Sequence, residues 1–134
     1  MSKFHLHIVT PRGTYRSEDV EMLNIRTTGG EIGILAHHIP LASGVEISEM
    51  NYLQEGKRFP FAIGGGFVYV GEDNVVTVIA NSVESPEEID LHRAEESKKR
   101  AEERLKDHHD DTDLRRAEIA LQKALIRINV KSST

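Results

Sequence analysis

Apolar residues alternate with polar ones along the first part of the chain, in short runs separated by turn residues. Phe4, Leu6 and Ile8 occupy every second position before the turn-forming Pro-Arg-Gly at 11–13. This period of two is typical of a strand with one buried face. Further strand-like runs follow at 23–27, 59–63, 67–70 and 75–79. Short strands at this spacing predict an all-β sandwich or barrel.

Three consecutive glycines, Gly64–Gly66, separate two of these runs. They match neither the dinucleotide-binding glycine pattern nor the phosphate-binding loop of nucleotide hydrolases, and no helical pattern follows them. We therefore interpret them as a bulge or tight turn in the sheet.

The second part of the chain has the hydrophobic period of helices. Residues of two seams recur at steps of three and four: Leu or Ala at 91, 94, 101 and 105 with Lys98 among them, and small or apolar residues at 114, 117, 121, 124 and 128. The polar stretch 107–110 between them predicts an antiparallel hairpin of two helices. Fusion into one helix from about Glu87 to Val130 stays open, and two arrangements of similar energy would suit a mechanical switch.

The seam of the first helix is thin, since it holds two Leu, two Ala and Lys98. Full burial of a Leu stabilises a protein by roughly 2 kcal/mol, whereas ordering costs about 1–2 kcal/mol per residue. We therefore expect the hairpin to be marginally stable alone and to depend on docking, a ligand or a partner.

Glycine and proline mark the boundary between the two parts. All ten Gly lie between Gly13 and Gly71, and no Pro follows Pro86, which is tolerated at a helix start. Residues 85–134 carry 23 charged side chains in 50 positions, whereas residues 1–84 carry 16. We therefore predict a sandwich domain over 1–84 and a helical domain over 85–134.

Composition excludes several classes of protein. Without Cys there is no disulfide framework and no thiolate metal site. A net charge of -5 and an aromatic content of 5% argue against a nucleic-acid-binding role. No apolar run approaches the ~18 residues of a membrane helix, and the first residues lack the apolar core of a signal peptide. We expect a soluble chain with no direct membrane insertion.

Candidate binding chemistry gathers on the two helices. Asp90, Arg93 and Arg100 can share one helix face, and Ala94 beside them leaves room for a flat ligand. On the second helix a lysine at 123 and an arginine at 127 are four residues apart, and in a hairpin they return beside the start of the first helix. Such cations and one carboxylate suit a phosphorylated ligand. A solvated surface laced with salt bridges is the alternative reading.

Two histidine pairs, His37-His38 and His108-His109, are the remaining candidates for chemistry. Adjacent side chains diverge on a strand or a helix, and no further ligands stand at metal spacing, so we interpret both pairs as loop residues. No serine has the sequence context of a catalytic nucleophile. The residues therefore predict neither a metal site nor a catalytic site.

Three motifs resemble a known family. They are Gly30-Glu-Ile-Gly-Ile-Leu-Ala-His-His-Ile-Pro-Leu41, Ile63-Gly-Gly-Gly-Phe-Val-Tyr-Val70 and Ile89-Asp-Leu-His-Arg-Ala94. In this order they resemble the epsilon subunits of F-type ATP synthases, of the kind found in bacilli, over almost the whole length. The resemblance implies an N-terminal antiparallel β-sandwich of about ten strands, followed by a C-terminal antiparallel hairpin of two helices.

The resemblance also implies partners and a role. In the family, the sandwich binds the gamma subunit and the ring of c subunits at the foot of the central stalk. The helices either fold as a hairpin that binds ATP as a regulatory ligand, or extend toward the alpha and beta subunits and inhibit ATP hydrolysis. A protein of this kind is a non-catalytic coupling subunit of a proton-translocating enzyme, peripheral on the cytoplasmic side of the cell membrane. Whether Mg²⁺ accompanies the nucleotide stays open.

Site residues are carried over by matching motifs. The resemblance places the ATP site on Glu84, Ile89, Asp90, Arg93, Ala94, Arg100, Lys123 and Arg127. Similar ATP-binding members have Arg where this chain has Lys123, and a lysine keeps the charge but lacks the bidentate fork. The face turned toward the c ring would hold Glu31, Ile32, Gly33 and His38.

Two rival functions follow from the residues. A free-standing nucleotide-sensing module would lack alpha, beta and gamma partners in co-purification. An enzyme that uses the histidine pairs would hold stoichiometric metal and lose activity on chelation.

Overall fold

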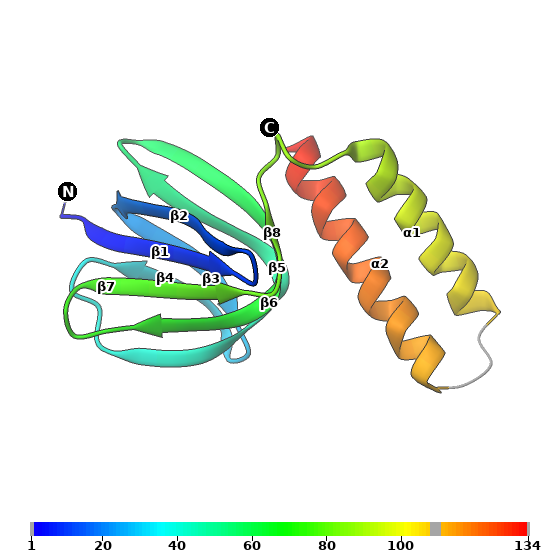
Figure 1. The fold of residues 1–134 in the computed structure, drawn as a ribbon, viewed down its shortest axis with the longest axis horizontal. Helices are drawn as coiled ribbons and strands as arrows, with labels where there is room; N and C mark the ends of the chain where they lie inside the picture. The colour runs from blue at the N-terminus through cyan, green and yellow to red at the C-terminus, as the bar shows by residue number, and fades with distance from the viewer. Residues whose placement is uncertain (1, 108–110, 134) are drawn as a thin grey trace.

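The computed structural model describes residues 2–107 and 111–133, which form a layered β-domain with a pair of helices beside it (Figure 1). The elements are β1 (Phe4–Thr10), β2 (Gly13–Val20), β3 (Met22–Thr27), β4 (Gly30–Leu35), β5 (Leu41–Gln54), β6 (Lys57–Val70), β7 (Val75–Ala80), β8 (Val83–Glu84), α1 (Leu91–Lys106) and α2 (Asp111–Ser132). The predicted fold class, a sandwich followed by two helices, is confirmed. The described residues form eight strands where the resemblance implies about ten, partly because β6 spans two of the expected runs.

The strands hydrogen-bond in the order β2-β1-β7-β6-β5-β3-β4, with β8 added to β6. The two longest strands, β5 and β6, pair antiparallel along their full length. The second half of β6 pairs with β7, and its middle pairs with β8. The pairing of β1 with β7 is parallel, an exception to the antiparallel pattern expected from the sequence.

Aromatic contacts close the sandwich over its core. The Tyr15 ring on β2 meets the Phe61 ring on β6 edge-on at 6.1 Å, although these two strands do not pair. Phe61 also stacks on Tyr52 with the ring centroids 5.4 Å apart. The Tyr52 hydroxyl donates to Glu18 and accepts from Arg16, and burial together with the bond to Glu18 raises the pKa of Tyr52 to about 12. These contacts hold β2 over β5 and β6.

The three glycines do not end a strand or form a bulge, so that prediction was wrong. Gly64–Gly66 lie inside β6, and the register with β5 is the same on both sides of them. Gly65 and Gly66 have positive φ values of 85° and 147°. A Cβ on Gly66 would lie 2.0 Å from the Ile79 carbonyl oxygen, and one on Gly64 would lie 2.2 Å from Ser82 Oγ. The glycines therefore let β6 keep its register while neighbouring chain approaches closely.

The two helices pack through alanine. Ala94 and Ala101 on α1 and Ala117 and Ala124 on α2 are all buried. The larger side chains of the predicted seam contribute less, since Leu91 is exposed at the start of α1. Alanine lets helix backbones approach closely but buries little apolar area, so the hairpin is as thinly packed as the sequence indicated.

The seat of α2 on the sandwich is equally small. Here the term seat means the contacts of α2 with β5, β6 and the linker before α1. Its apolar part is Ala62, Ile89 and Val130, with Ile126 packed against them. In its polar part, Gln122 Nε2 donates to the Ile47 carbonyl at 3.2 Å, and Lys131 Nζ donates to the Pro86 carbonyl at 2.9 Å. In Figure 1, α2 is the helix beside the sheet and α1 lies on its outer side.

The first helix begins at Leu91, where its predicted seam begins, and not at Glu87, the approximate start of the alternative fused helix. Residues 86–88 form a turn instead, in which the Glu88 amide donates to the Ser85 carbonyl at 3.0 Å. The Glu88 side chain completes this turn, because its Oε1 accepts from the Ser85 amide and the Ser85 hydroxyl, each at 2.9 Å. The Tyr15 hydroxyl of β2 donates to the same oxygen. We call this group, Tyr15, Ser85 and Glu88, the linker clamp.

The linker clamp shifts the titration of its acidic groups. Burial and the bond to Glu88 raise the pKa of Tyr15. Partial burial of Glu88 acts in the opposite direction, but the donors Tyr15 and Ser85 outweigh it and lower the pKa of Glu88. Glu88 therefore stays ionised to lower pH than an ordinary glutamate, which keeps it a strong acceptor.

Gly66→Ala should destabilise the sandwich by about 3 kcal/mol or more, because the new Cβ meets backbone atoms and the residue has positive φ. Gly13→Ala is the matched control, since Gly13 has a φ of +117° but nothing within 4 Å of an added Cβ. It should cost about 1–2 kcal/mol. Urea unfolding of both variants measures the difference, and equal losses would contradict the steric role of Gly66.

Acidification should remove the contribution of Glu88 to the free energy of unfolding. The pKa of Glu88 is lower in the folded state than its ordinary value of 4.5, so its contribution is complete above that value and is lost as pH falls through the folded-state pKa. The wild type should therefore lose more stability than Glu88→Gln between about pH 6 and pH 3. Glu72→Gln, in the exposed turn after β6, is the control. If the free energy of unfolding of wild type and of Glu88→Gln changed equally with pH, this contribution of Glu88 would be excluded.

Candidate functional site

A cavity of about 300 Å³ lies between α2 and the sandwich. Its apolar lining is Ile47, Ala62, Ile63, Ala120, Ala124 and Ile126. Its polar lining is Ser82 and Glu84 from the sandwich, Ser97 from α1, and Lys123 and Arg127 from α2. Three of the eight residues predicted for nucleotide binding, Glu84, Lys123 and Arg127, therefore line one cavity. Its mixture of apolar wall, cations and one carboxylate is suited to a small anionic ligand.

Two of these residues form an ion pair. Arg127 Nε lies 2.8 Å from Glu84 Oε1, but the N–H does not point at that oxygen well enough for a hydrogen bond. The hydrogen bond of the pair runs from Arg127 Nη2 to Glu84 Oε2 at 3.3 Å. The side chains are 26% and 32% exposed, so water screens the pair only in part. Arg127 is thus positioned at the cavity by a carboxylate of β8.

The start of α1 holds the Ile-Asp-x-x-Arg-Ala motif. Asp90 is the N-cap of α1, and its carboxylate accepts from the Arg93 amide at 3.1 Å. Aspartate favours this place because it satisfies a free amide and faces the positive end of the helix. Ile89 and Ala94 are buried, Ile89 against Ala62 and Val130 and Ala94 between the helices. These two residues give the motif its packing.

Arg93 and Arg100 are exposed on α1 and do not line the cavity. Arg100 Nη2 donates to Ser97 Oγ at 3.2 Å, and Ser97 reaches the cavity. Residues 93, 97 and 100 stand at steps of four and three, so they share one helix face. The sequence analysis missed Ser97, although its spacing between the two arginines was a usable signal. Ser82, from the loop before β8, had no signal in the sequence.

The residues predicted to face the c ring separate in the structure. Glu31, Ile32 and Gly33 on β4 line a second cavity of about 660 Å³, which shares Ile47 and Ile126 with the first. Arg26 Nη2 donates to Glu31 Oε1 there at 2.7 Å. His38 lies beyond the other end of β4.

The loop after β4 is fixed by one side chain. Asn74 Oδ1 accepts from the His37 amide at 2.8 Å, and Asn74 Nδ2 donates to the Lys3 carbonyl at 2.9 Å. His37-His38 is therefore a loop pair as predicted, whereas His108-His109 lies outside the described residues. Ile39 at the tip of this loop is 76% exposed.

An apolar patch lies on the outer face of β6 and β7. Phe67 pairs directly with Ile79 across these strands, Tyr69 follows on the same face, and all three are exposed. Outward-facing strand positions are usually polar. A cluster of this kind marks a contact surface.

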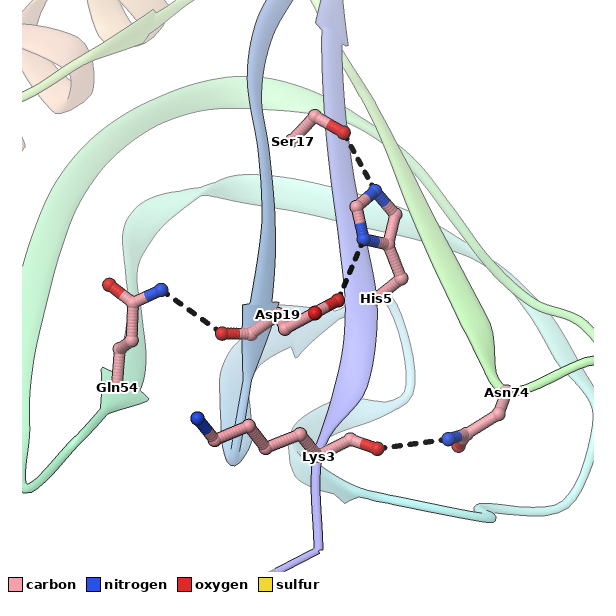
Figure 2. A network of polar contacts seen from close by, with 6 residues as sticks. All are labelled: Lys3, His5, Ser17, Asp19, Gln54 and Asn74. Atoms are coloured by element: carbon pink, nitrogen blue, oxygen red, sulfur yellow. Dashed lines mark hydrogen bonds and ion pairs between the residues drawn. The ribbon is translucent and has the colours of Figure 1, made fainter.

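A Ser-His-Asp cluster lies on the outer face of β1 and β2 (Figure 2). His5 Nδ1 lies 2.9 Å from Asp19 Oδ1, and His5 Nε2 lies 2.7 Å from Ser17 Oγ. The connectivity matches a hydrolase triad, but the Asp19 and His5 side chains are 68% and 41% exposed. In a hydrolase triad the carboxylate orients the imidazole and stabilises its protonated form. Water screens the Asp19 carboxylate here, which weakens both effects. We interpret the cluster as a surface hydrogen-bond network.

Metal-binding clusters and membrane-spanning helices would also bear on function. The described residues contain no group of three or more His, Cys, Asp or Glu side chains that could hold a metal ion. None of the helices, over the same residues, combines the length and the apolar character that crossing a membrane requires.

Two family models match the chain in succession. Residues 3–86 match the β-sandwich domain of the ATP synthase delta/epsilon chain, and residues 87–132 match its long α-helix domain. An ATP synthase epsilon chain of Bacillus mycoides (strain KBAB4) is 44% identical over 130 residues, 97% of each chain. One of Desulfitobacterium hafniense (strain Y51) is 44% identical over 126 residues, 94% of each chain.

Solved structures of ATP synthases contain chains with a similar fold. A chain in the Euglena gracilis mitochondrial ATP synthase, in a structure of OSCP, F1 and the c-ring, has a TM-score of 0.81 and 26% identity, over 91% of this chain and 77% of that one. A chain in the central stalk and c-ring of the Tetrahymena thermophila enzyme has a TM-score of 0.62 at 15% identity, over 98% and 96%. The second likeness concerns the fold alone. The motifs, the two-part fold and these matches together establish that the chain belongs to the ATP synthase delta/epsilon family.

Proposed function

We propose that this chain is a regulatory and coupling subunit in the central stalk of a proton-translocating F-type ATP synthase, peripheral on the cytoplasmic side of the cell membrane. In this role it is not itself catalytic. The sandwich attaches to the rotor, and the helical hairpin senses ATP. Membership of the family supports the place of this chain in the ATP synthase. The relatives that it matches over nearly their full length are named ATP synthase epsilon chains.

The observation that carries the nucleotide proposal is the cavity between α2 and the sandwich. Its carboxylate and two cations come from Glu84, Lys123 and Arg127, which are distant in sequence. In this proposal the cations bind the phosphates and Glu84 accepts from a ribose hydroxyl or the base amine. A volume of about 300 Å³ is at the small end of ligand sites. ATP would thus be partly enclosed, with its remainder along the helices.

The ion pair of Arg127 with Glu84 indicates how binding would proceed. Arg127 is held by Glu84, so a phosphate must compete with this carboxylate for the guanidinium. Arg93 and Arg100 flank Ser97 on the face of α1 that reaches the cavity, and their side chains would complete the phosphate shell. Bound ATP would then bridge α1, α2 and the sandwich, and would stabilise the folded hairpin.

Release of the hairpin is the other half of the proposed regulation. The alanine seam and the small seat provide little stabilisation, so an extended arrangement of the helices along gamma, toward alpha and beta, is accessible in energy. In that arrangement the helices would obstruct ATP hydrolysis. ATP bound to the folded form would oppose it by mass action.

Two surfaces of the sandwich support the proposed rotor contacts. The apolar patch of Phe67, Tyr69 and Ile79 suits a packed protein interface, and we assign it to gamma. The second surface we assign to the c ring, and it has two separate parts: the loop with His38 and the exposed Ile39, and Glu31–Gly33 on β4. A chain of the same fold occurs in a structure that contains F1 and the c-ring, which supports a place of the sandwich beside the rotor.

ATP should raise the melting temperature of the isolated protein. A ligand bound only to the folded state stabilises it by about 2.7 kcal/mol at a hundredfold excess over Kd. Arg93→Ala and Arg127→Ala should abolish most of the shift, whereas Arg115→Ala, a cation two turns before Lys123 on α2, should not. Titration with and without Mg²⁺ shows whether the ion takes part. An unchanged melting temperature in millimolar ATP would exclude the site.

Lys123→Arg should tighten ATP binding, because a guanidinium can form two parallel hydrogen bonds to a phosphate and an ammonium cannot. The gain should be about 1 kcal/mol at most. Calorimetric titration of wild type and variant measures it. A Kd that is unchanged or larger would mean that Lys123 does not contact the ligand.

Removal of residues 87–134 should leave a folded sandwich that binds gamma but does not respond to ATP. The sandwich has its own core, and it shares only the small seat with the helices. Reconstitution with full-length and truncated chains, followed by measurement of ATP hydrolysis and proton pumping, tests this. Hydrolysis should rise if the helices inhibit it. A truncated chain that cannot assemble would contradict the two-part proposal.

A further inference from the structure

The helical hairpin is attached to the sandwich in two separate ways. The seat joins α2 to the sheet through Ile126, Arg127 and Gln122. The linker clamp joins residues 85–88 to β2 through Tyr15. All of the side chains that make the clamp lie outside the helices. Loss of the seat therefore removes none of its hydrogen bonds.

The clamp concentrates its contacts on a single atom. Glu88 Oε1 accepts from the Tyr15 hydroxyl, the Ser85 hydroxyl and the Ser85 amide. Ser85 is itself buried, and the Tyr15 ring is held by its edge contact with Phe61 in the core. Hydrogen bonds to an ionised acceptor are stronger than neutral ones. The turn is thus tied to the core of the sandwich.

Two hydrogen-bonded units meet just after the clamp. The Ile89 amide is the last donor to the turn, to the Pro86 carbonyl at 3.3 Å. The Asp90 carbonyl is the first acceptor of α1, from the Ala94 amide at 3.0 Å. Asp90 has extended backbone angles between the two. Rotation at this boundary would break neither unit.

We propose that residues 85–88 are a fixed part of the sandwich, and that the helices, when they leave it, pivot at Ile89–Asp90. The pivot is thus placed after the linker clamp instead of at the end of β8. This inference builds on the helix movement of the proposed function. The test of the pivot needs neither nucleotide nor partner. The pivot can therefore be refuted while the proposed function stands, and the proposed function can be refuted while the pivot stands.

The charges around the clamp favour its persistence. Arg16 on β2 is a cation that favours the ionised form of Glu88, and Glu87 lies beside it in the turn with Lys131 of α2 nearby. When α2 leaves, Lys131 and its bond to the Pro86 carbonyl leave too. Arg16 and Tyr15 remain, because both belong to β2.

Amide hydrogen exchange of the full-length chain tests the pivot. The double variant Ile126→Asp/Arg127→Ala puts a charge against the apolar part of the seat, removes the ion pair with Glu84 and leaves the clamp intact. Amides of α2 should exchange at least about tenfold faster, whereas those of Ser85 and Glu88 should stay within about threefold of wild type. Amides of β6 are the reference for an intact sandwich. Exchange of Ser85 and Glu88 that accelerates together with α2 would overturn the proposal.

Variants of the clamp give the complementary result. Glu88→Ala and Tyr15→Phe, each added to the seat variant, should accelerate exchange at Ser85 and Glu88 by about tenfold. Glu72→Ala and Tyr69→Phe are the matched controls, since both lie on the surface of the sandwich away from the linker. The controls should leave these amides unchanged. Equal exchange in clamp variants and controls would show that Glu88 does not hold the linker, and would also overturn the proposal.

Discussion

The small seat of α2 on the sandwich is the contact on which the position of the helices and the two cavities beside them depend. The apolar part of the seat consists of Ala62, Ile89, Val130 and Ile126, with cavities of about 300 and 660 Å³ meeting at Ile47 and Ile126. A larger apolar contact would fill those cavities and fix the helices permanently. The polar groups that line them are available to ligands because the seat is narrow. The weak docking and the proposed ligand binding thus have one structural origin.

The charges at the cavity have a second consequence. Arg127 is only partly exposed, and without a counter-ion it would face a desolvation cost. Glu84 offsets that cost. An anionic ligand therefore gains less from Arg127 than from an exposed lysine such as Lys123, because it must first displace a carboxylate. The affinity of such a site reflects an exchange of partners and not the number of cations alone.

Much of this fold could be predicted from local patterns. Alternating residues gave strands such as β1 and β3, and the step of three and four gave both helices, because these periods follow directly from backbone geometry. The turn at 86–88 before α1 could not be predicted, since it depends on the contact of Tyr15 with Glu88, residues 73 positions apart. The continuity of β6 through Gly64–Gly66 was missed for a similar reason. Only the approach of Ile79 and Ser82 reveals why glycine is needed there.

The candidate site was likewise predictable from local patterns only in part. Spacing placed cations on two helices, and the resemblance supplied Glu84, but neither could show that Glu84 and Arg127 form an ion pair. Ser82 was not predicted because it reaches the cavity through the loop before β8. The separation of Glu31 from His38 depends on the direction of β4, which the motif does not contain. Contacts between distant segments set each of these features.

The two long strands give the sandwich a mechanical property. β5 and β6 are paired over their whole length in one continuous register, and they run beneath both the seat of α2 and the apolar patch. A force applied between the patch and the helices would act along the strands and load many of their hydrogen bonds at once. Hydrogen bonds that are loaded together withstand a much larger force than hydrogen bonds that open one after another from the end of a strand. The sandwich is therefore a stiff element, which suits the transmission of force between the rotor and the helices in the proposed function.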